Sequence, residues 1–179
     1  MQKIVTLTDR DIFGGEPKFM NAVSRYASRG VLVNHKLQAA MMFMAKLNLF
    51  KLPGGGIEEG ENPESAFLRE IREETGCEAE IVHELGYTEE HKNQNQYMQY
   101  SYCYIAKLLR STDDAMLTEH EMELGMKVNW IALENAIEIM NHSAQECDDY
   151  STRFMILRDL AILEKAYRWL DEANLCNPH

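Results

Sequence analysis

Strand-like runs of hydrophobic residues, each bounded by turn-forming residues, occupy much of the chain. They predict strands at 23–33, 39–46, 80–87, 97–108 and 127–131. The first two strands form a hairpin across residues 34–36, and a polar loop at 89–96 separates the next two. A shorter alternating segment at 3–7 precedes a turn at 14–17. The continuous apolar run Met-Met-Phe-Met at 41–44 indicates a buried strand, and core packing explains it better than a methionine ligand patch.

Helical spacing replaces this pattern in three segments. Asn62 is a good N-cap and Pro63 a good first residue for a helix that ends before Gly76, a residue suited to the left-handed conformation after a helix. A shorter helix is predicted at 133–140, and a long one from about 151 to 172. Hydrophobic residues recur in the long helix at intervals of 4, 3, 4 and 3, at Ile156, Leu160, Leu163, Tyr167 and Leu170. Such a stripe is typical of a helix that packs on a sheet or on a partner helix.

Strands mixed with a central and a terminal helix predict an α/β fold in which helices cover a mixed sheet. With 179 residues the chain is long enough for a sizeable core, and we expect a single domain over 1–179 with an N-terminal extension at 1–20. No internal repeat, low-complexity tract or linker divides the chain. The apolar stripe of the long helix also makes a homodimer possible.

The charge balance narrows the class of partner. The formal net charge is −11, and no run rich in lysine or arginine offsets it, which argues against DNA or RNA binding. No apolar run approaches the roughly 20 residues of a membrane span, and the N-terminal residues 1–10 lack the apolar core of a secretion signal. Scattered cysteines without a CxxC spacing predict free thiols in a reducing cytoplasm, at Cys77, Cys103, Cys147 and Cys176. A small anionic substrate is compatible with this charge if metal ions neutralise it locally.

Residues 55–77 carry the densest chemistry of the chain. A glycine-rich turn at 53–56 is followed by the helix that contains Glu70, Glu73 and Glu74. At about 100° per residue, Glu73 lies roughly 60° to one side of Glu70 and Glu74 roughly 40° to the other, so the three carboxylates share one sector of the helix. Like charges at these spacings destabilise a bare helix by on the order of a few tenths of a kcal/mol per pair. Mg²⁺ or Mn²⁺, which prefer oxygen ligands, would compensate for this repulsion.

Flanking residues fit the same chemistry. Arg69 stands four residues before Glu73 and can also reach back to Glu61, which suits an arginine that orients carboxylates around a metal ion. The glycine turn lets backbone approach a metal or phosphate closely, and the Gly54 carbonyl is a candidate ligand. A glutamate cluster alone is most often a solvated helix face. However, seven fixed residues and one aliphatic position match by chance only on the order of once per 10⁹ starting positions at ordinary residue frequencies.

The segment resembles the Nudix box, Gly-x5-Glu-x7-Arg-Glu-U-x-Glu-Glu-x-Gly-U, in which U is a bulky aliphatic residue. The matching residues, in order, are Gly55, Glu61, Arg69, Glu70, Ile71, Glu73, Glu74 and Gly76. Cys77 departs from the pattern at the last position, a change that concerns packing rather than metal binding. The preceding Leu52-Pro53-Gly54 is also typical of the family.

The resemblance implies a Nudix-like α/β/α sandwich that hydrolyses a nucleoside diphosphate linked to another group, or a nucleoside triphosphate. It implies Mg²⁺ or Mn²⁺ bound by Glu70, Glu73, Glu74 and the Gly54 carbonyl, with Glu61 assisting. Water attacks phosphorus while metals stabilise the developing charge. The proton goes to Glu70 or to a glutamate outside the box, where three candidates precede Trp130.

Those candidates are Glu119, Glu121 and Glu123, of which Glu123 is preferred, while a solvated acidic loop accounts for the others.

Substrate identity is open at this stage. Family members that act on ADP-ribose often carry a proline about fifteen residues past the box, but no proline lies between Pro63 and Pro178. Arg25 and Arg29, on the strand before the box, are candidate phosphate contacts, although surface salt bridges explain them equally well. Tyr97 is a weaker candidate for stacking on a base, because strand packing explains alternating tyrosines better.

Three classes of function compete. The leading one is a metal-dependent pyrophosphohydrolase that acts on a small nucleotide. The second is a non-catalytic Nudix-like module that binds a nucleotide and regulates a partner, and the third is a structural domain that dimerises through its long helix. Non-catalytic modules of the second class tend to lose the glutamates of the box. This chain keeps all four, which favours the enzyme.

Overall fold

A mixed sheet between two layers of helices organises the computed structural model, which describes residues 1–112 and 114–173. In chain order the elements are β1 (Lys3–Thr8), α1 (Asp9–Phe13), β2 (Arg25–Val33), β3 (Gln38–Met44), β4 (Leu49–Lys51), β5 (Gly54–Gly56), α2 (Pro63–Thr75), β6 (Cys77–Lys92), the 3₁₀ turn η1 (Asn93–Asn95), β7 (Tyr97–Ser111), α3 (Glu119–Glu123), β8 (Met126–Ala132), α4 (Leu133–Glu146) and α5 (Tyr150–Glu172). The predicted α/β class is confirmed.

The strand order places the glycine-rich segment beside a central strand. Within the described residues the sheet has eight strands, ordered β1-β6-β7-β2-β3-β4, with β5 paired to β2 and β8 paired to β3. β1 is parallel to β6 and β2 is parallel to β7, whereas the hairpin pair β2–β3 is antiparallel. β3 pairs with β2 at Val33 and Ala39. Residues Ala27, Ser28 and Arg29 of β2 pair instead with Gly54–Gly56 of β5.

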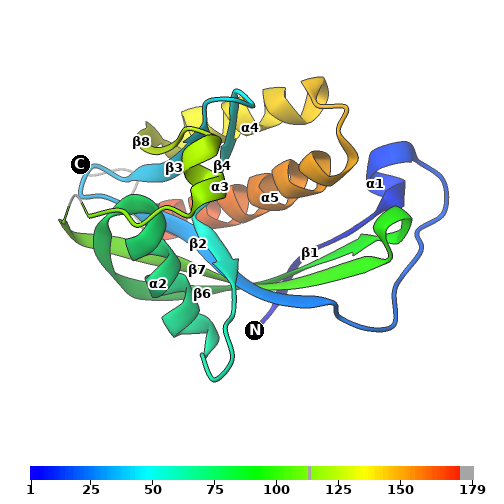
Figure 1. Cartoon of the computed structure of the whole chain (residues 1–179), viewed down its shortest axis with the longest axis horizontal. Helices are drawn as coiled ribbons and strands as arrows, with labels where there is room; N and C mark the ends of the chain where they lie inside the picture. Colours follow the sequence, from blue (N-terminus) through cyan, green and yellow to red (C-terminus); the bar gives the residue numbers. More distant parts are fainter. Residues whose placement is uncertain (113, 174–179) are drawn as a thin grey trace.

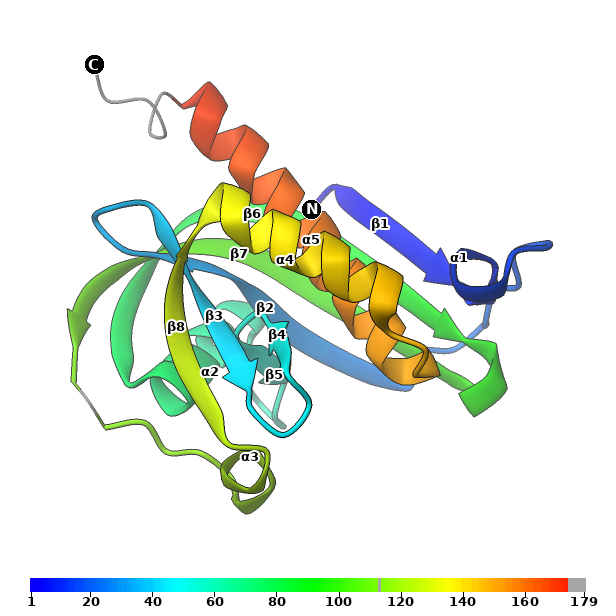
Figure 2. The same ribbon diagram turned by 90° about the horizontal axis from the view of Figure 1, so that it is seen from above.

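Helices cover both faces of the sheet. α2 lies on one face (Figure 1), where Phe67 and Ile71 are fully buried in a cluster with Leu32, Tyr104 and Ala106. α4 and α5 lie next to each other on the opposite face (Figure 2). The α/β/α sandwich is therefore confirmed.

The long C-terminal helix uses its apolar stripe within the chain. Its bounds, Tyr150–Glu172, agree with the prediction to within a residue. Ile156 and Leu163 are fully buried in the larger core cluster, together with Val31 of β2 and Met41 of β3. The predicted burial of the methionine-rich strand is thus confirmed as well.

The strands after α2 extend further than their polar sequence suggested. The predicted loop at 89–96 is wrong over its first four residues, since β6 continues to Lys92. Glu90 and His91 are buried within this strand. Glu90 is accommodated there because the guanidinium of Arg158 on α5 pairs with it at 3.1 Å.

Smaller differences lie at other boundaries. Residues 3–8, within the expected N-terminal extension, form a strand of the main sheet. α4 continues to Glu146 rather than ending at 140, and the unpredicted α3 begins with a capping box between Thr118 and Glu121. The described cysteines Cys77, Cys103 and Cys147 are free thiols, as predicted, and Cys176 lies outside the described residues. No helix in the described part of the chain has the length and hydrophobicity to span a membrane.

Candidate active site

Local signals at both ends of α2 position the acidic cluster. The side chain of Asn62 accepts a hydrogen bond from the Ser65 backbone N–H at 2.8 Å, and Pro63 is the first helical residue. Gly76 ends the helix in the left-handed conformation, with φ of 63°. Both predicted caps are confirmed. They set the ends of α2. Burial of Phe67 and Ile71 turns one side of the helix into the core, while Glu70 and Glu74 on the acidic side contact β5.

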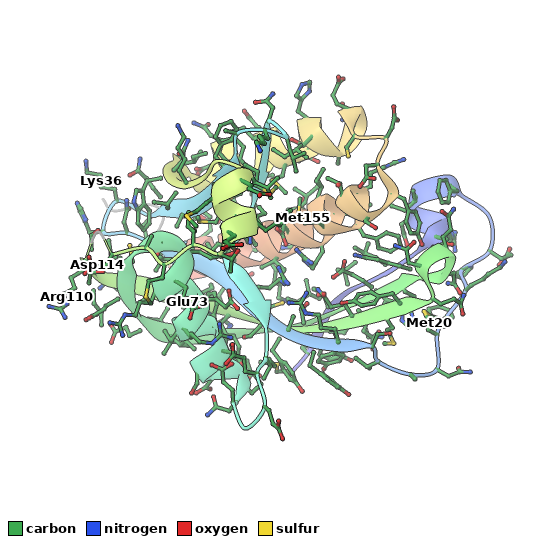
Figure 3. The ribbon with its side chains drawn as sticks, in the orientation of Figure 1. Met20, Lys36, Glu73, Arg110, Asp114 and Met155 are labelled. Atoms are coloured by element: carbon green, nitrogen blue, oxygen red, sulfur yellow. The ribbon has the colours of Figure 1, made fainter. Side chains whose placement is uncertain are left out.

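The acidic side of α2 opens into a cavity of about 540 Å³ between α2, β5, α3 and α5. Glu70, Glu73 and Glu74 line it from α2, and Met155 lines it from α5; Figure 3 labels Glu73 and Met155. A larger cavity of about 760 Å³ lies beside the β2–β3 hairpin, around Val82 and Trp169, and holds none of these carboxylates. The smaller cavity is the candidate site because it contains the groups that can do chemistry.

Arg69 holds three carboxylates and one carbonyl in place. Its Nε and Nη2 donate to the two oxygens of Glu61 at 2.9 and 3.0 Å, and its Nη1 donates to Glu70 at 2.9 Å and to Glu73 at 3.0 Å. Nη2 also donates to the Gly56 carbonyl at 2.9 Å. These hydrogen bonds keep the pKa of Glu61 below its usual range. The contacts from Arg69 to Glu61 and Glu73 are those that the sequence spacing predicts.

Glu74 lies deepest of the four box carboxylates. Its side chain is buried, pairs with the Lys51 ammonium, and accepts a hydrogen bond from the Gly54 backbone N–H at 2.9 Å. Burial raises the pKa of Glu74 to about 7, although Lys51 and the Gly54 N–H act in the opposite direction. Burial likewise raises the pKa of Glu70, against the effect of Arg69. The charged forms of Glu70 and Glu74 are therefore incompletely solvated.

The glycine turn allows backbone to touch the acidic cluster. A Cβ atom at Gly55 would lie 2.3 Å from Oε1 of Glu70, and a Cβ at Gly54 would lie 2.3 Å from the Cβ of Arg29. Gly54 also has φ of 141°, which other residues rarely adopt. The close approach that the sequence suggests for this turn is present. Position 54 requires glycine, whereas a side chain at position 55 would displace the Glu70 carboxylate.

The donor set fits a divalent metal ion of the hard, oxygen-binding kind. Within residues 1–112 and 114–173 no three acidic, histidine or cysteine side chains are already gathered as a ligand set. The box carboxylates are bound to cationic side chains instead. Arg69 bridges three of them and Lys51 pairs with the fourth. The donors of the box residues are all oxygens, and a cation would relieve the incomplete solvation of Glu70 and Glu74.

The remaining predicted site residues divide into two groups. Arg25 and Arg29 line the cavity, and the guanidinium of Arg25 lies over Gly56, where a Cβ would meet Nη2 at 2.8 Å. Glu123 is exposed on α3 and does not line the cavity, whereas Glu121 of the same helix does. Tyr97 also lies outside the lining, with its hydroxyl 3.5 Å from Oε1 of Gln99.

The polar residues of the lining that sequence reasoning missed include Lys51, Gln99 and Arg158. These three lie on β4, β7 and α5, outside the box, and only the fold brings them to the cavity. For Arg158 the sequence did contain a signal of a buried charge. The charged pair Arg158-Asp159 interrupts the otherwise apolar segment 154–163, and a charged pair in such a place is expected to have buried partners.

Most of this sequence is similar to that of known proteins. A family model described as the NUDIX domain matches residues 25–151. Diphosphoinositol polyphosphate phosphohydrolase 3-alpha from Mus musculus is 28% identical over 89 residues, which is 50% of this chain and 51% of that protein. Nudix hydrolase 10 from Arabidopsis thaliana is 27% identical over 118 residues, covering 65% of this chain and 40% of that protein. The chain spans about half the length of the curated relatives it matches.

Solved structures share the fold. A NUDIX hydrolase from Nitrosomonas europaea aligns with a TM-score of 0.55 at 16% identity, over 75% of this chain and 86% of that one. An Ap4A hydrolase from C. elegans aligns with a TM-score of 0.50 at 22% identity, over 83% of this chain and 99% of that one. At these identities the likeness concerns the fold, and the chemistry has to be argued from the side chains.

Proposed function

This chain belongs to the Nudix family, and from that premise we propose that it is a metal-dependent hydrolase of a diphosphate bond in a nucleoside diphosphate derivative or a nucleoside triphosphate. One observation carries the proposal. Glu61, Glu70 and Glu73 converge on Arg69. Arg69, Glu70, Glu73 and the buried Glu74 line a cavity large enough for a phosphate chain. Nudix hydrolases generally use divalent metals, and this set of oxygen donors suits Mg²⁺ or Mn²⁺.

The box residues take distinct roles in this proposal. Glu70, Glu73, Glu74 and the Gly54 carbonyl would hold the metal, with Glu61 assisting. When bound, the metal supplies charge neutralisation at the diphosphate and lowers the pKa of a bound water.

Two cationic side chains position these carboxylates, and a glutamate accepts the proton. Arg69 keeps the carboxylates oriented, and Lys51 holds Glu74 against the glycine turn. The proton of the attacking water goes to Glu70 or to a glutamate of the α3 region. Within that region Glu121 lines the cavity, whereas Glu123, which the sequence favoured, is exposed outside it.

Opposite charges across the cavity support a phosphate-rich substrate. Arg25 and Arg29 of β2 line the same space as the carboxylates of α2. A diphosphate in this space would meet the Arg25 guanidinium as well as the metal-binding carboxylates. The relatives include proteins named as phosphohydrolases of diphosphoinositol polyphosphates, which agrees with a small substrate that carries linked phosphates.

One observation favours a non-catalytic nucleotide-binding module as the second candidate. Arg69 and Lys51 already pair with all four box carboxylates, which would suit a domain that binds nucleotide without metal. A panel of nucleoside diphosphate derivatives and triphosphates, incubated with Mg²⁺ or Mn²⁺ and resolved by chromatography, separates the two. We expect hydrolysis of at least one compound. Tight binding of a compound without hydrolysis across the panel would favour the regulatory module.

A further inference from the structure

Two buried arginines lie in the cavity wall that α5 and β2 form. Arg29 of β2 is 5% exposed and Arg158 of α5 is 4% exposed, and both line the cavity. Arginine is seldom buried to this degree unless an anion pairs with it, because a desolvated charge without a partner is costly. The partners of the two guanidinium groups therefore indicate what the site is built for.

Arg158 is held in place by two buried carboxylates. Its Nε donates to Asp159 Oδ1 at 2.8 Å, and its Nη1 donates to Glu90 Oε2 at 3.1 Å. Lys92 pairs with the other oxygen of Glu90 at 3.2 Å. Among the described residues, Nη2 of Arg158 makes no hydrogen bond, so one donor of this fixed guanidinium is left for a ligand.

Arg29 has no anionic partner among the described residues. Its single hydrogen bond runs from Nε to the hydroxyl of Ser101 at 3.3 Å, and neither Nη group forms an ion pair. Burial and the neighbouring Arg158 lower the pKa of Arg29, but a guanidinium stays charged in proteins. Glu90 and Asp159 also act on the charge of Arg29, but their direct contacts are with Arg158 and Lys92. In the described part of the chain two carboxylates thus face three cations, and Arg29 is the one without a carboxylate in direct contact.

The register of the sheet places Arg29 next to the acidic cluster. Arg29 pairs with Gly54 across β2 and β5, and the Gly54 N–H contacts Glu74 at 2.9 Å. Neighbouring strands lie about 4.8 Å apart. An anion bound by the arginines would therefore be close to a diphosphate held at the carboxylates, within the reach of one phosphate chain.

We propose that Arg29 and Arg158 form a two-arginine subsite that binds a further phosphoryl group of the substrate, beyond the diphosphate that is cleaved. The proposal rests on the proposed function for the identity of its ligand. The substrate class that it indicates carries three or more phosphoryl groups, rather than a diphosphate that joins two uncharged groups. Arginine suits this task because its planar donors match phosphate oxygens in pairs.

Binding of inorganic tripolyphosphate in buffer with EDTA tests the subsite without metal or turnover. By calorimetry we expect the wild-type chain to bind tripolyphosphate, and Arg29→Met to weaken this binding at least tenfold. Arg29→Lys should retain part of the affinity. Arg110→Met is the matched control, since Arg110 is exposed and pairs with Glu78 at 2.7 Å away from the cavity; its affinity should equal that of the wild type.

A stability measurement separates ligand binding from a structural role. Removing an unpaired buried charge does not weaken a fold, so we expect ligand-free Arg29→Met to melt at or above the temperature of the wild type. Tripolyphosphate should raise the melting temperature of the wild type and not that of the variant. Unchanged tripolyphosphate affinity in Arg29→Met, or a lower melting temperature of the ligand-free variant, would overturn the subsite.

The two proposals can fail separately. If tripolyphosphate binding depends on Arg29 while the nucleotide panel shows no hydrolysis, the subsite stands and the hydrolase proposal fails. If a nucleotide is hydrolysed with the same KM by wild type and Arg29→Met, the hydrolase stands and the subsite fails.

Discussion

Asp159 on α5 accepts a hydrogen bond from the backbone N–H of Leu52 at 2.9 Å. Leu52 lies between β4 and the glycine-rich β5, so this bond ties the middle of the C-terminal helix to the turn that contacts Glu74. The other oxygen of Asp159 pairs with Arg158. One buried carboxylate thereby fixes both the backbone that contacts Glu74 and an arginine that lines the same cavity.

Asp159→Ala should destabilise the chain. The change leaves the Leu52 N–H without its acceptor and removes one of the two carboxylates around the buried Arg158, which we expect to lower the free energy of unfolding by about 2–4 kcal/mol. Denaturant titration measures this. The nearby Asp148 is exposed, and Asp148→Ala should stay within about 0.5 kcal/mol of the wild type. An equal loss in both variants would mean that the Asp159 contacts contribute nothing specific.

Gly55→Ala should disturb metal binding more than folding. Its Cβ would lie 2.3 Å from Oε1 of Glu70, and a flexible carboxylate moves more easily than the backbone. We expect Mg²⁺ affinity, measured by calorimetry, to fall by about tenfold or more. Gly15→Ala is a control at an open position with φ of 86°. It should cost about 1–2 kcal/mol of stability and leave Mg²⁺ affinity unchanged.

Arg69→Lys should separate charge from geometry. Lysine keeps the positive charge but cannot donate to Glu61, Glu70 and Glu73 together, as the guanidinium does. Activity and metal affinity should fall by about 10–100-fold. Arg72 is exposed on the same helix, so Arg72→Lys should match the wild type. Full activity of Arg69→Lys would show that orientation of the carboxylates is unimportant.

The burial of Glu74 predicts a pH dependence of stability in metal-free buffer. The folded-state pKa is about 7 and the ordinary value 4.5, so between these pH values the folded chain binds more protons than the unfolded chain. Its stability therefore falls as pH rises through this window.

Glu74→Gln removes the titrating group, so its free energy of unfolding should rise relative to the wild type by roughly 2 kcal/mol between pH 5 and pH 8. Glu80 is exposed, and Glu80→Gln should follow the wild type across this range. Parallel pH profiles of Glu74→Gln and the wild type would contradict the account.

Local signals in the sequence were sufficient for α2. Asn62, Pro63 and Gly76 set its ends, and the box spacing anticipated the contacts of Arg69. These features depend on residues close together in the chain. The buried side of α5 was equally predictable, because the residues on one side of a helix recur at a fixed spacing in the sequence.

Features that depend on distant partners were not predictable. β6 continues through Glu90 because Arg158, 68 residues later, pairs with it. Separation along the chain also kept Lys51 out of the predicted site, since it lies 23 residues from its partner Glu74. Glu123 was preferred over Glu121 from position alone, and only the turn of α3 decides which of them lines the cavity.

The central claim is that the box carboxylates bind the metal that hydrolysis requires. Its most direct test is Mg²⁺-dependent release of phosphate-containing product by the wild type and by the Glu73→Gln/Glu74→Gln double variant, on the compound of the nucleotide panel that is turned over fastest. Circular dichroism verifies that both chains are folded. The account predicts that the double variant loses at least about 100-fold in turnover. Full turnover by the folded double variant would contradict it.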